Sequence, residues 1–225
     1  MSRTYPASPG PQLRLVRPEP EPLVLTVPGL GGSGPDHWQS HWERERSNVR
    51  RVELGQWDRP HRNSWVNQLN LAIERAGRPV VLAAHSLGCL AVAWWVAYER
   101  PSFYGPVIGA LLVAPPEVEE APRDPRLRRF APLPDEELPF PSILVASRDD
   151  PWMPYARARQ VARGWGSWFV DAGRQGHLNA ESGLGDWRFG QLLLDQLLRR
   201  SGALFDLAPA PVAAESEDWN RHIGG

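Results

Sequence analysis

Cysteine is almost absent from this sequence of 225 residues, in which Cys89 is the only one. A single thiol cannot form an internal disulfide or a thiolate metal cluster, and its scarcity agrees with a reducing compartment. Long apolar runs are lacking too, since no stretch approaches the roughly 20 apolar residues of a membrane-spanning helix. The proline-containing N-terminus also lacks the apolar core of a signal peptide. These absences predict a cytoplasmic protein that does not enter a membrane.

An excess of charge of either sign is also missing. The 25 basic and 26 acidic residues give a formal net charge of -1, so there is no cationic surplus that would indicate nucleic-acid binding. Proline and tryptophan are plentiful, at 24 and 11 residues. Prolines gather near both ends, which predicts flexible extensions over residues 1–21 and 205–225 around one folded domain at 22–204.

Short apolar segments alternate with segments of helical periodicity inside that domain. The expected strands are 23–27, 49–54, 79–84, 107–114, 142–146 and 167–170, and the expected helices are 35–46, 64–76, 87–98, 154–163 and 186–199. Strands that are apolar throughout are typical of a parallel sheet covered by helices on both faces. The order predicts an α/β fold with a doubly wound sheet of about six mostly parallel strands. The irregular stretch 115–139 has too little apolar periodicity for a large lid.

The pentapeptide Ala84-His85-Ser86-Leu87-Gly88 follows an expected strand and opens an expected helix. This is the context of a nucleophile elbow, a sharp turn that exposes a serine and needs small residues two positions before and after it. Alanine takes the first small position, where glycine is usual. The alternative interpretation is a serine that caps a buried helix. We expect the His85 side chain to point away from that of Ser86 and to support the turn.

A serine hydroxyl becomes a strong nucleophile only when a base takes its proton, and the base needs an acid to orient it. His177 lies in a polar, glycine-rich loop after the last expected strand. Asp149 and Asp150 follow the strand at 142–146, in the chain order serine, acid, histidine that this kind of fold uses. We therefore predict Ser86 as nucleophile, His177 as base and Asp150 as acid, with Asp149 as the alternative acid.

Acyl transfer also needs donors for the developing oxyanion, and the backbone N–H groups of Leu30 and Leu87 are the candidates. Leu30 belongs to the glycine-rich loop 28–34, which lacks the spacing and the lysine of phosphate-binding loops, so no nucleotide cofactor is expected. His37 and His41 lie one helical turn apart. They have no evident third ligand, so we predict a structural helix face and no metal site.

These segments together resemble the YdeN-like family of small serine hydrolases within the α/β-hydrolases. The resemblance covers about residues 23–198 and rests on 27–29 with the glycine loop, 36–42, 84–88, 147–151, and Gly176-His177 with Asn179. It implies Asp150 rather than Asp149 as the acid, an uncovered active site, and hydrolysis of small acyl esters without a cofactor.

Two other functions fit the same residues. A thioesterase or acyltransferase would use the same three side chains on a different second substrate. A protein-interaction module would use the tryptophans or the proline-rich ends, with no nucleic acid or membrane as partner. Trp94 and Trp95 have the spacing of core residues, whereas Trp57, Trp65 and Trp152 are candidates for walls of the pocket.

Overall fold

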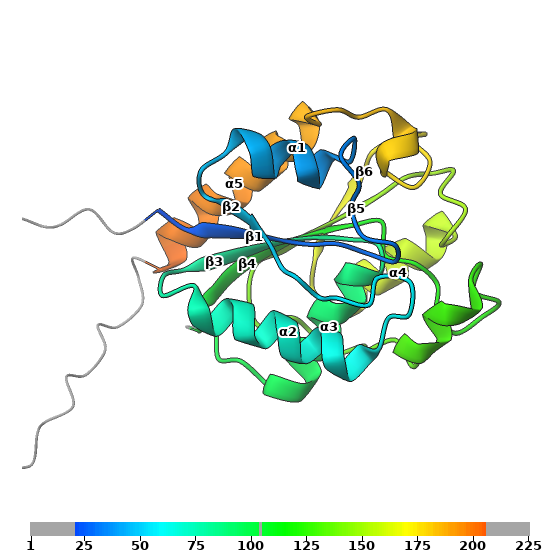
Figure 1. Ribbon diagram of the computed structural model, residues 1–225, viewed down its shortest axis with the longest axis horizontal. Helices are drawn as coiled ribbons and strands as arrows, with labels where there is room; N and C mark the ends of the chain where they lie inside the picture. Colours follow the sequence, from blue (N-terminus) through cyan, green and yellow to red (C-terminus); the bar gives the residue numbers. More distant parts are fainter. Residues whose placement is uncertain (1–20, 104, 206–225) are drawn as a thin grey trace, which may run out of the picture.

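A single parallel sheet of six strands forms the centre of the molecule (Figure 1). The computed structural model describes residues 21–103 and 105–205, so the expected extensions lie outside it apart from Glu21 and Phe205. The strand order is β2-β1-β3-β4-β5-β6. The strands are β1 (Leu23–Val27), β2 (Val49–Arg51), β3 (Val80–His85), β4 (Val107–Val113), β5 (Ser142–Ala146) and β6 (Trp168–Asp171). The predicted α/β class and its parallel sheet are confirmed.

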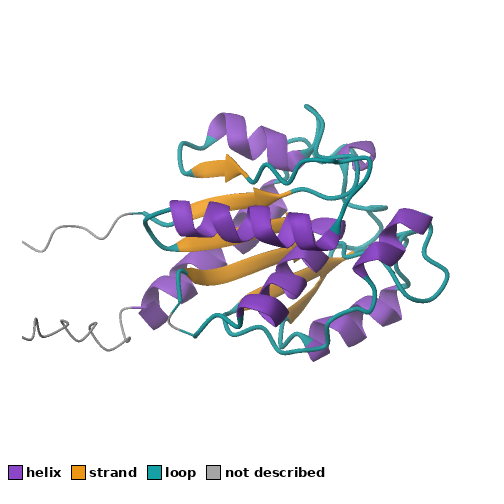
Figure 2. Cartoon of the chain, turned by 60° about the horizontal axis from the view of Figure 1, so that its bottom comes forward, coloured by secondary structure: helices purple, strands orange, loops and turns teal. Residues whose placement is uncertain are grey.

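Helices cover both faces of this sheet. They are α1 (Trp38–Glu45), α2 (Arg62–Arg75), α3 (Leu87–Glu99), α4 (Tyr155–Gly164) and α5 (Arg188–Phe205). In Figure 1, α1 and α5 lie above the sheet and α2 and α3 below it, and Figure 2 shows helices in front of and behind the strands. The apolar side chains of α4 belong to the same buried cluster as those of α2 and α3. The side chains of α1 and α5 form the opposite cluster.

The expected strands match the sheet because their residues are buried on both faces. Every residue of β1, β3, β4 and β5 is buried, which is why each reads as a continuous apolar run. The second strand is shorter than predicted and ends at Arg51. The N–H of Val52 still donates to Thr26, but the N–H of Leu54 donates to Val52, so the chain has already turned there.

The strand order changes direction between β1 and β3, since the chain moves from β1 outward to β2 and then back to the other side. Ligands of such sheets bind at the carboxyl ends of the strands beside this switch point. The loop after β1 contains Leu30, and the turn after β3 contains Ser86. The topology therefore brings these two predicted site residues to one edge of the sheet.

The stretch 115–139 forms no lid domain. Its regular part is the 3-10 helix η1 (Pro125–Phe130), which packs against α3. Leu127 and Phe130 are both fully buried, so this segment covers the core beside α3. Among the described residues, no helix has the length and apolar character needed to cross a membrane.

Gly88 lets the first turn of α3 lie directly against the end of β1. A Cβ atom at this position would stand 2.1 Å from the carbonyl oxygen of Val27 and 2.7 Å from that of Pro28. Both atoms belong to backbone, so neither can rotate away. The second small residue of the pentapeptide is thus required by the packing of the turn on its neighbouring strand.

We predict that Gly88→Ala lowers the free energy of unfolding by about 1–3 kcal/mol, because the added methyl overpacks this contact. Urea denaturation monitored by tryptophan fluorescence measures the change. The matched control is Gly34→Ala, where no atom lies within 4 Å of the added Cβ. Equal stability of the two variants would contradict this account of the turn.

Candidate active site

Ser86 lies at the turn between β3 and α3 in a backbone conformation that side chains rarely adopt, with φ 52° and ψ -125°. Such strain of roughly 1–3 kcal/mol persists only where the surroundings enforce it. Here the Ser86 N–H donates to the Val113 carbonyl at 2.9 Å. The hydroxyl makes no capping hydrogen bond to α3, so the helix-cap interpretation does not describe this serine.

The structure brings Ser86, His177 and Asp150 into one chain of hydrogen bonds. His177 Nε2 lies 2.9 Å from Ser86 Oγ. His177 Nδ1 lies 2.9 and 3.0 Å from the two carboxylate oxygens of Asp150. The side chains of His177 and Asp150 are only 7% and 4% exposed, so water competes little for these contacts. Since Nδ1–H donates to the carboxylate, Nε2 has a lone pair that accepts from the serine hydroxyl.

Asp149 makes different contacts from its neighbour. Its carboxylate accepts from the Ser147 hydroxyl at 2.7 Å and from the Gly176 N–H at 2.9 Å. The Ser147 hydroxyl and then the Gly176 N–H hold the pKa of Asp149 below its ordinary value. This aspartate therefore ties the end of β5 to the loop that carries His177, and its contacts go to the loop backbone instead of the imidazole.

Two further donors hold the His177 loop from the other side. His85 Nε2–H donates to the His177 carbonyl at 2.9 Å, and Trp38 Nε1–H donates to the Leu178 carbonyl at 3.0 Å. Burial lowers the pKa of His85 well below 6.5, and the neighbouring His37 adds to this effect. His85 and Ser86 both line one cavity.

His37 has a role that its helical spacing did not indicate. It is the N-cap of α1, where its Nδ1 accepts from the Gln39 N–H at 3.2 Å. The proton must then be on Nε2, which has no partner among the described residues. Burial, helped by the positive charge of Arg51, lowers the pKa of His37 to about 3. A neutral imidazole thus lies in the wall of the cavity that contains Ser86.

The candidate oxyanion donors belong to the turn at Ser86 and to the glycine-rich loop after β1. Leu87 is the first residue of α3, a position whose N–H has no partner within the helix. Leu30 lines the cavity with Ser86. A Cβ at Gly29 would lie 2.8 Å from the Ser86 Cβ, so the glycine brings this loop close to the serine.

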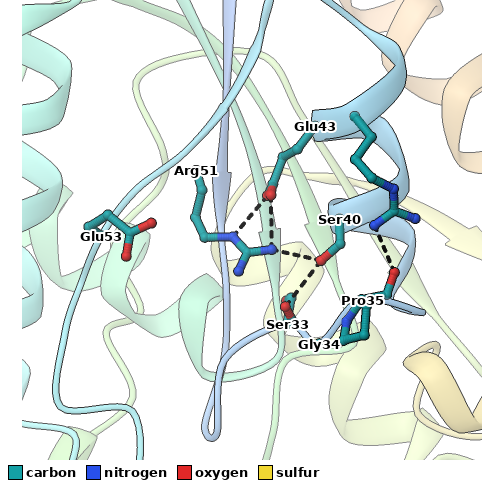
Figure 3. Close-up of a pocket in the computed structure, with 8 residues that line it drawn as sticks. Ser33, Gly34, Pro35, Ser40, Glu43, Arg51 and Glu53 are labelled. Atoms are coloured by element: carbon teal, nitrogen blue, oxygen red, sulfur yellow. Dashed lines mark hydrogen bonds and ion pairs between the residues drawn. The ribbon is translucent and has the colours of Figure 1, made fainter.

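The glycine loop is supported from behind by a polar network (Figure 3). Arg51 donates to Ser40 Oγ at 2.7 Å and pairs with Glu43 at 2.9 Å. The Ser40 hydroxyl then donates to the Ser33 carbonyl at 3.1 Å. These side chains flank a separate polar cavity of about 460 Å³. Their mutual pairing fixes the loop that presents Leu30.

Two cavities meet over His177. The inner cavity, of about 230 Å³, contains Ser86. The outer cavity, of about 570 Å³, is lined by polar residues of the His177 loop together with two arginines. The residues that line both are Trp152, His177, Asn179 and Glu181. The sequence predicted Trp152 as a wall of the pocket. Asn179 was named only among the residues that carry the family resemblance, and no pattern in the sequence indicated Glu181.

The other tryptophans lie elsewhere. Trp65 is fully buried and donates to the Gly55 carbonyl, so its prediction as a pocket wall is wrong. Helical residues at its spacing pack into the core, and Trp65 contacts Phe130 there. Trp57 packs against Gly32 behind the glycine loop and lines neither cavity. Trp152 alone of the three candidates faces the site, with its ring stacked 5.1 Å from that of His177.

The described residues contain no group of three or more His, Cys, Asp or Glu side chains arranged to hold a metal ion. Cys89 is fully buried three residues after the serine. Burial raises the pKa of its thiol, which keeps it protonated and unreactive. Cys89 is thus a small buried residue of α3.

A family model described as serine hydrolase matches residues 24–196. A YdeN-like hydrolase from Pectobacterium atrosepticum is 34% identical, with 82% of this chain and 92% of that chain covered and a TM-score of 0.69. No curated protein matches the sequence.

More distant structures share the fold. The ydeN gene product of B. subtilis is 18% identical over 79% of this chain and 99% of that one, with a TM-score of 0.61. A thermophilic esterase from Thermogutta terrifontis is 16% identical over 80% and 90% of the two chains, with a TM-score of 0.58.

The buried neutral His37 predicts a loss of stability in mild acid. Its folded-state pKa of about 3 lies below the ordinary 6.5, so under pH 6.5 the unfolded chain takes up a proton that the folded chain does not. Between pH 6.5 and 5 this contribution costs about 2 kcal/mol. His37→Asn keeps an oxygen to cap α1 and removes the ionisable ring. We expect its free energy of unfolding to fall less over this interval, as measured by urea denaturation at each pH, and parallel curves would refute the assignment.

Proposed function

Because the chain belongs to the serine hydrolase family within the α/β-hydrolases, we propose that it hydrolyses small acyl esters with Ser86 as nucleophile, His177 as base and Asp150 as acid. The observation that carries this proposal is the unbroken hydrogen-bond chain from Ser86 Oγ through the His177 ring to both oxygens of Asp150. It has the geometry that nucleophilic catalysis by serine requires.

The reaction follows from the direction of these hydrogen bonds. Asp150 holds the Nδ1–H of His177, so Nε2 takes the proton of Ser86 as Oγ attacks the acyl carbon. Negative charge then develops on the former carbonyl oxygen. The N–H groups of Leu30 and Leu87 are the proposed donors to it, each worth about 3–4 kcal/mol by analogy with other oxyanion holes. Asp150 stabilises the imidazolium through the same contact.

The second half of the reaction uses the same groups in reverse. The C–O bond to the leaving group breaks, and the departing oxygen takes the proton from His177. A water molecule, deprotonated by His177, then attacks the acyl carbon. The bond to Ser86 Oγ breaks, Oγ takes the proton back from His177, and the acid is released. A thioester passes through the same acyl-enzyme, and an alcohol in place of water makes the protein an acyltransferase. Product analysis separates these outcomes.

The size of the inner cavity supports small acyl groups as substrates. Its volume of about 230 Å³ equals the liquid volume of roughly eight water molecules at about 30 Å³ each. An acetyl to butyryl group fits such a space. The open outer cavity leaves more room on the other side of the ester.

The assignment of the acid is tested by paired variants. We predict that Asp150→Asn lowers kcat for p-nitrophenyl acetate by roughly 10³–10⁴-fold, because an amide no longer stabilises the correct tautomer and the imidazolium. Asp149→Asn keeps an oxygen that accepts from Ser147 and Gly176. We expect its kcat to fall less than about tenfold, because such a loss corresponds to the weakening of a hydrogen bond.

Steady-state kinetics on both purified variants measure these losses, with circular dichroism to establish that each is folded. Ser86→Ala sets the background rate. If Asp149→Asn loses as much activity as Asp150→Asn, the acid is wrongly assigned. If folded wild-type protein hydrolyses no short ester above the Ser86→Ala background, the esterase proposal fails and partner binding becomes the function to test.

A further inference from the structure

The outer cavity has a cationic lining next to the proposed base. Arg123 and Arg174 contribute from two separate loops, and neither guanidinium lies within 4 Å of a carboxylate in the part of the chain that the structure describes. The Arg123 guanidinium lies 5.7 Å from the centre of the Trp152 ring. Trp152 in turn stacks on His177. A line of contacts therefore runs from the proposed base to a guanidinium.

The proposed chemistry determines which part of a substrate enters this cavity. His177 gives its proton to the departing oxygen, so the leaving group must lie against His177. The inner cavity is bounded by Leu30, His37 and His85 around Ser86, and it takes the acyl group. The outer cavity begins at His177 and extends over its loop toward Arg174, which makes it the space for the leaving group.

The charges that face this space do not cancel. Besides the two arginines, the carboxylate that lines it is Glu181, at the junction of the two cavities. Asp149 lies near Arg174, but its carboxylate is already engaged by Ser147 and Gly176. Asp150 is held by His177. The outer cavity is thus positive beside the two arginines and negative beside Glu181, where it meets the inner cavity. The guanidinium groups are well suited to bind carboxylate or phosphate oxygens.

We propose that the outer cavity is a subsite for an anionic leaving group, in which Arg123 and Arg174 bind a carboxylate or phosphate at the end remote from the scissile bond. This rests on the proposed esterase function. The Glu181 carboxylate repels an anion placed close to the bond, so the negative group sits farther out, beside the arginines. The preferred esters are those of short acids with alcohols or phenols that carry a negative charge.

The test compares esters that differ only in the charge of the leaving group. para-Acetoxybenzoate is anionic and para-acetoxybenzamide is its neutral match, while para-acetoxyphenyl phosphate separates phosphate from carboxylate recognition. The measured quantity is the ratio of kcat/KM for each anionic ester to that for the neutral one. We expect Arg123→Gln and Arg174→Gln, at two exposed arginines, each to lower this ratio roughly two- to five-fold, the size of one exposed charge interaction. The double variant should lower it roughly tenfold.

Two further charge changes serve as controls. Glu181→Gln is expected to raise the ratio roughly two- to five-fold, and Arg163→Gln, at an exposed arginine that lines neither cavity, should leave it unchanged. Raising the ionic strength should lower the wild-type ratio, because salt screens charges beyond about 8 Å at 0.15 M. A merely structural role of the arginines would change the rates for charged and neutral esters together and leave the ratio constant, which would overturn the proposal.

A binding measurement keeps the subsite separate from the chemistry. In Ser86→Ala, NMR titration with para-hydroxybenzoate and para-hydroxybenzamide compares affinities for the anionic and neutral leaving groups. Tighter binding of the anion, lost in the double arginine variant, supports the subsite even if no ester is hydrolysed and the proposed function fails. Equal binding of the two compounds overturns the subsite even if p-nitrophenyl acetate is a good substrate.

Discussion

The strained turn at Ser86 is the constraint on which the rest of the site depends. Its conformation, with φ 52°, is imposed by packing. Because Gly88 has no side chain, the start of α3 packs directly against the Val27 and Pro28 carbonyls, and Gly29 likewise leaves space beside the Ser86 Cβ. Strain of this kind persists only when several contacts enforce it. Among the residues that the structure describes, the hydroxyl at this edge of the sheet has His177 as its hydrogen-bond partner. The fold thus leaves this group available for chemistry.

The second requirement is that His177, 91 residues later in the chain, stays within hydrogen-bond distance of that hydroxyl. Three hydrogen bonds to different parts of the chain hold its loop in place. His85 and Trp38 bind its carbonyls, and the Gly176 N–H binds Asp149. His85 directly precedes Ser86, so one residue connects the serine turn to the His177 loop. Both buried histidines beside the loop stay neutral, which avoids repulsion of a protonated His177 during the reaction.

The sequence predicted what depends on local patterns. Buried strands read as apolar runs, and the serine, aspartate and histidine follow strands in a fixed order, so sheet and candidate residues were both identifiable. Contacts between residues far apart in the sequence could not be predicted in this way. The His85 contact joins residues 92 apart, and Trp38 reaches Leu178 across 140. Trp65 contacts Phe130 of the irregular segment, and helical periodicity does not identify that partner. The division into two cavities likewise arises from several loops together.

The central claim is that one serine, activated by its place in this turn, performs the covalent chemistry. Labelling with a fluorophosphonate, followed by intact mass and peptide mapping, tests it most directly, because the reagent phosphonylates an activated serine. The account predicts one adduct per chain, on Ser86, with esterase activity lost in proportion to labelling. An adduct at another residue, or ester hydrolysis that continues after Ser86 is fully modified, would contradict it.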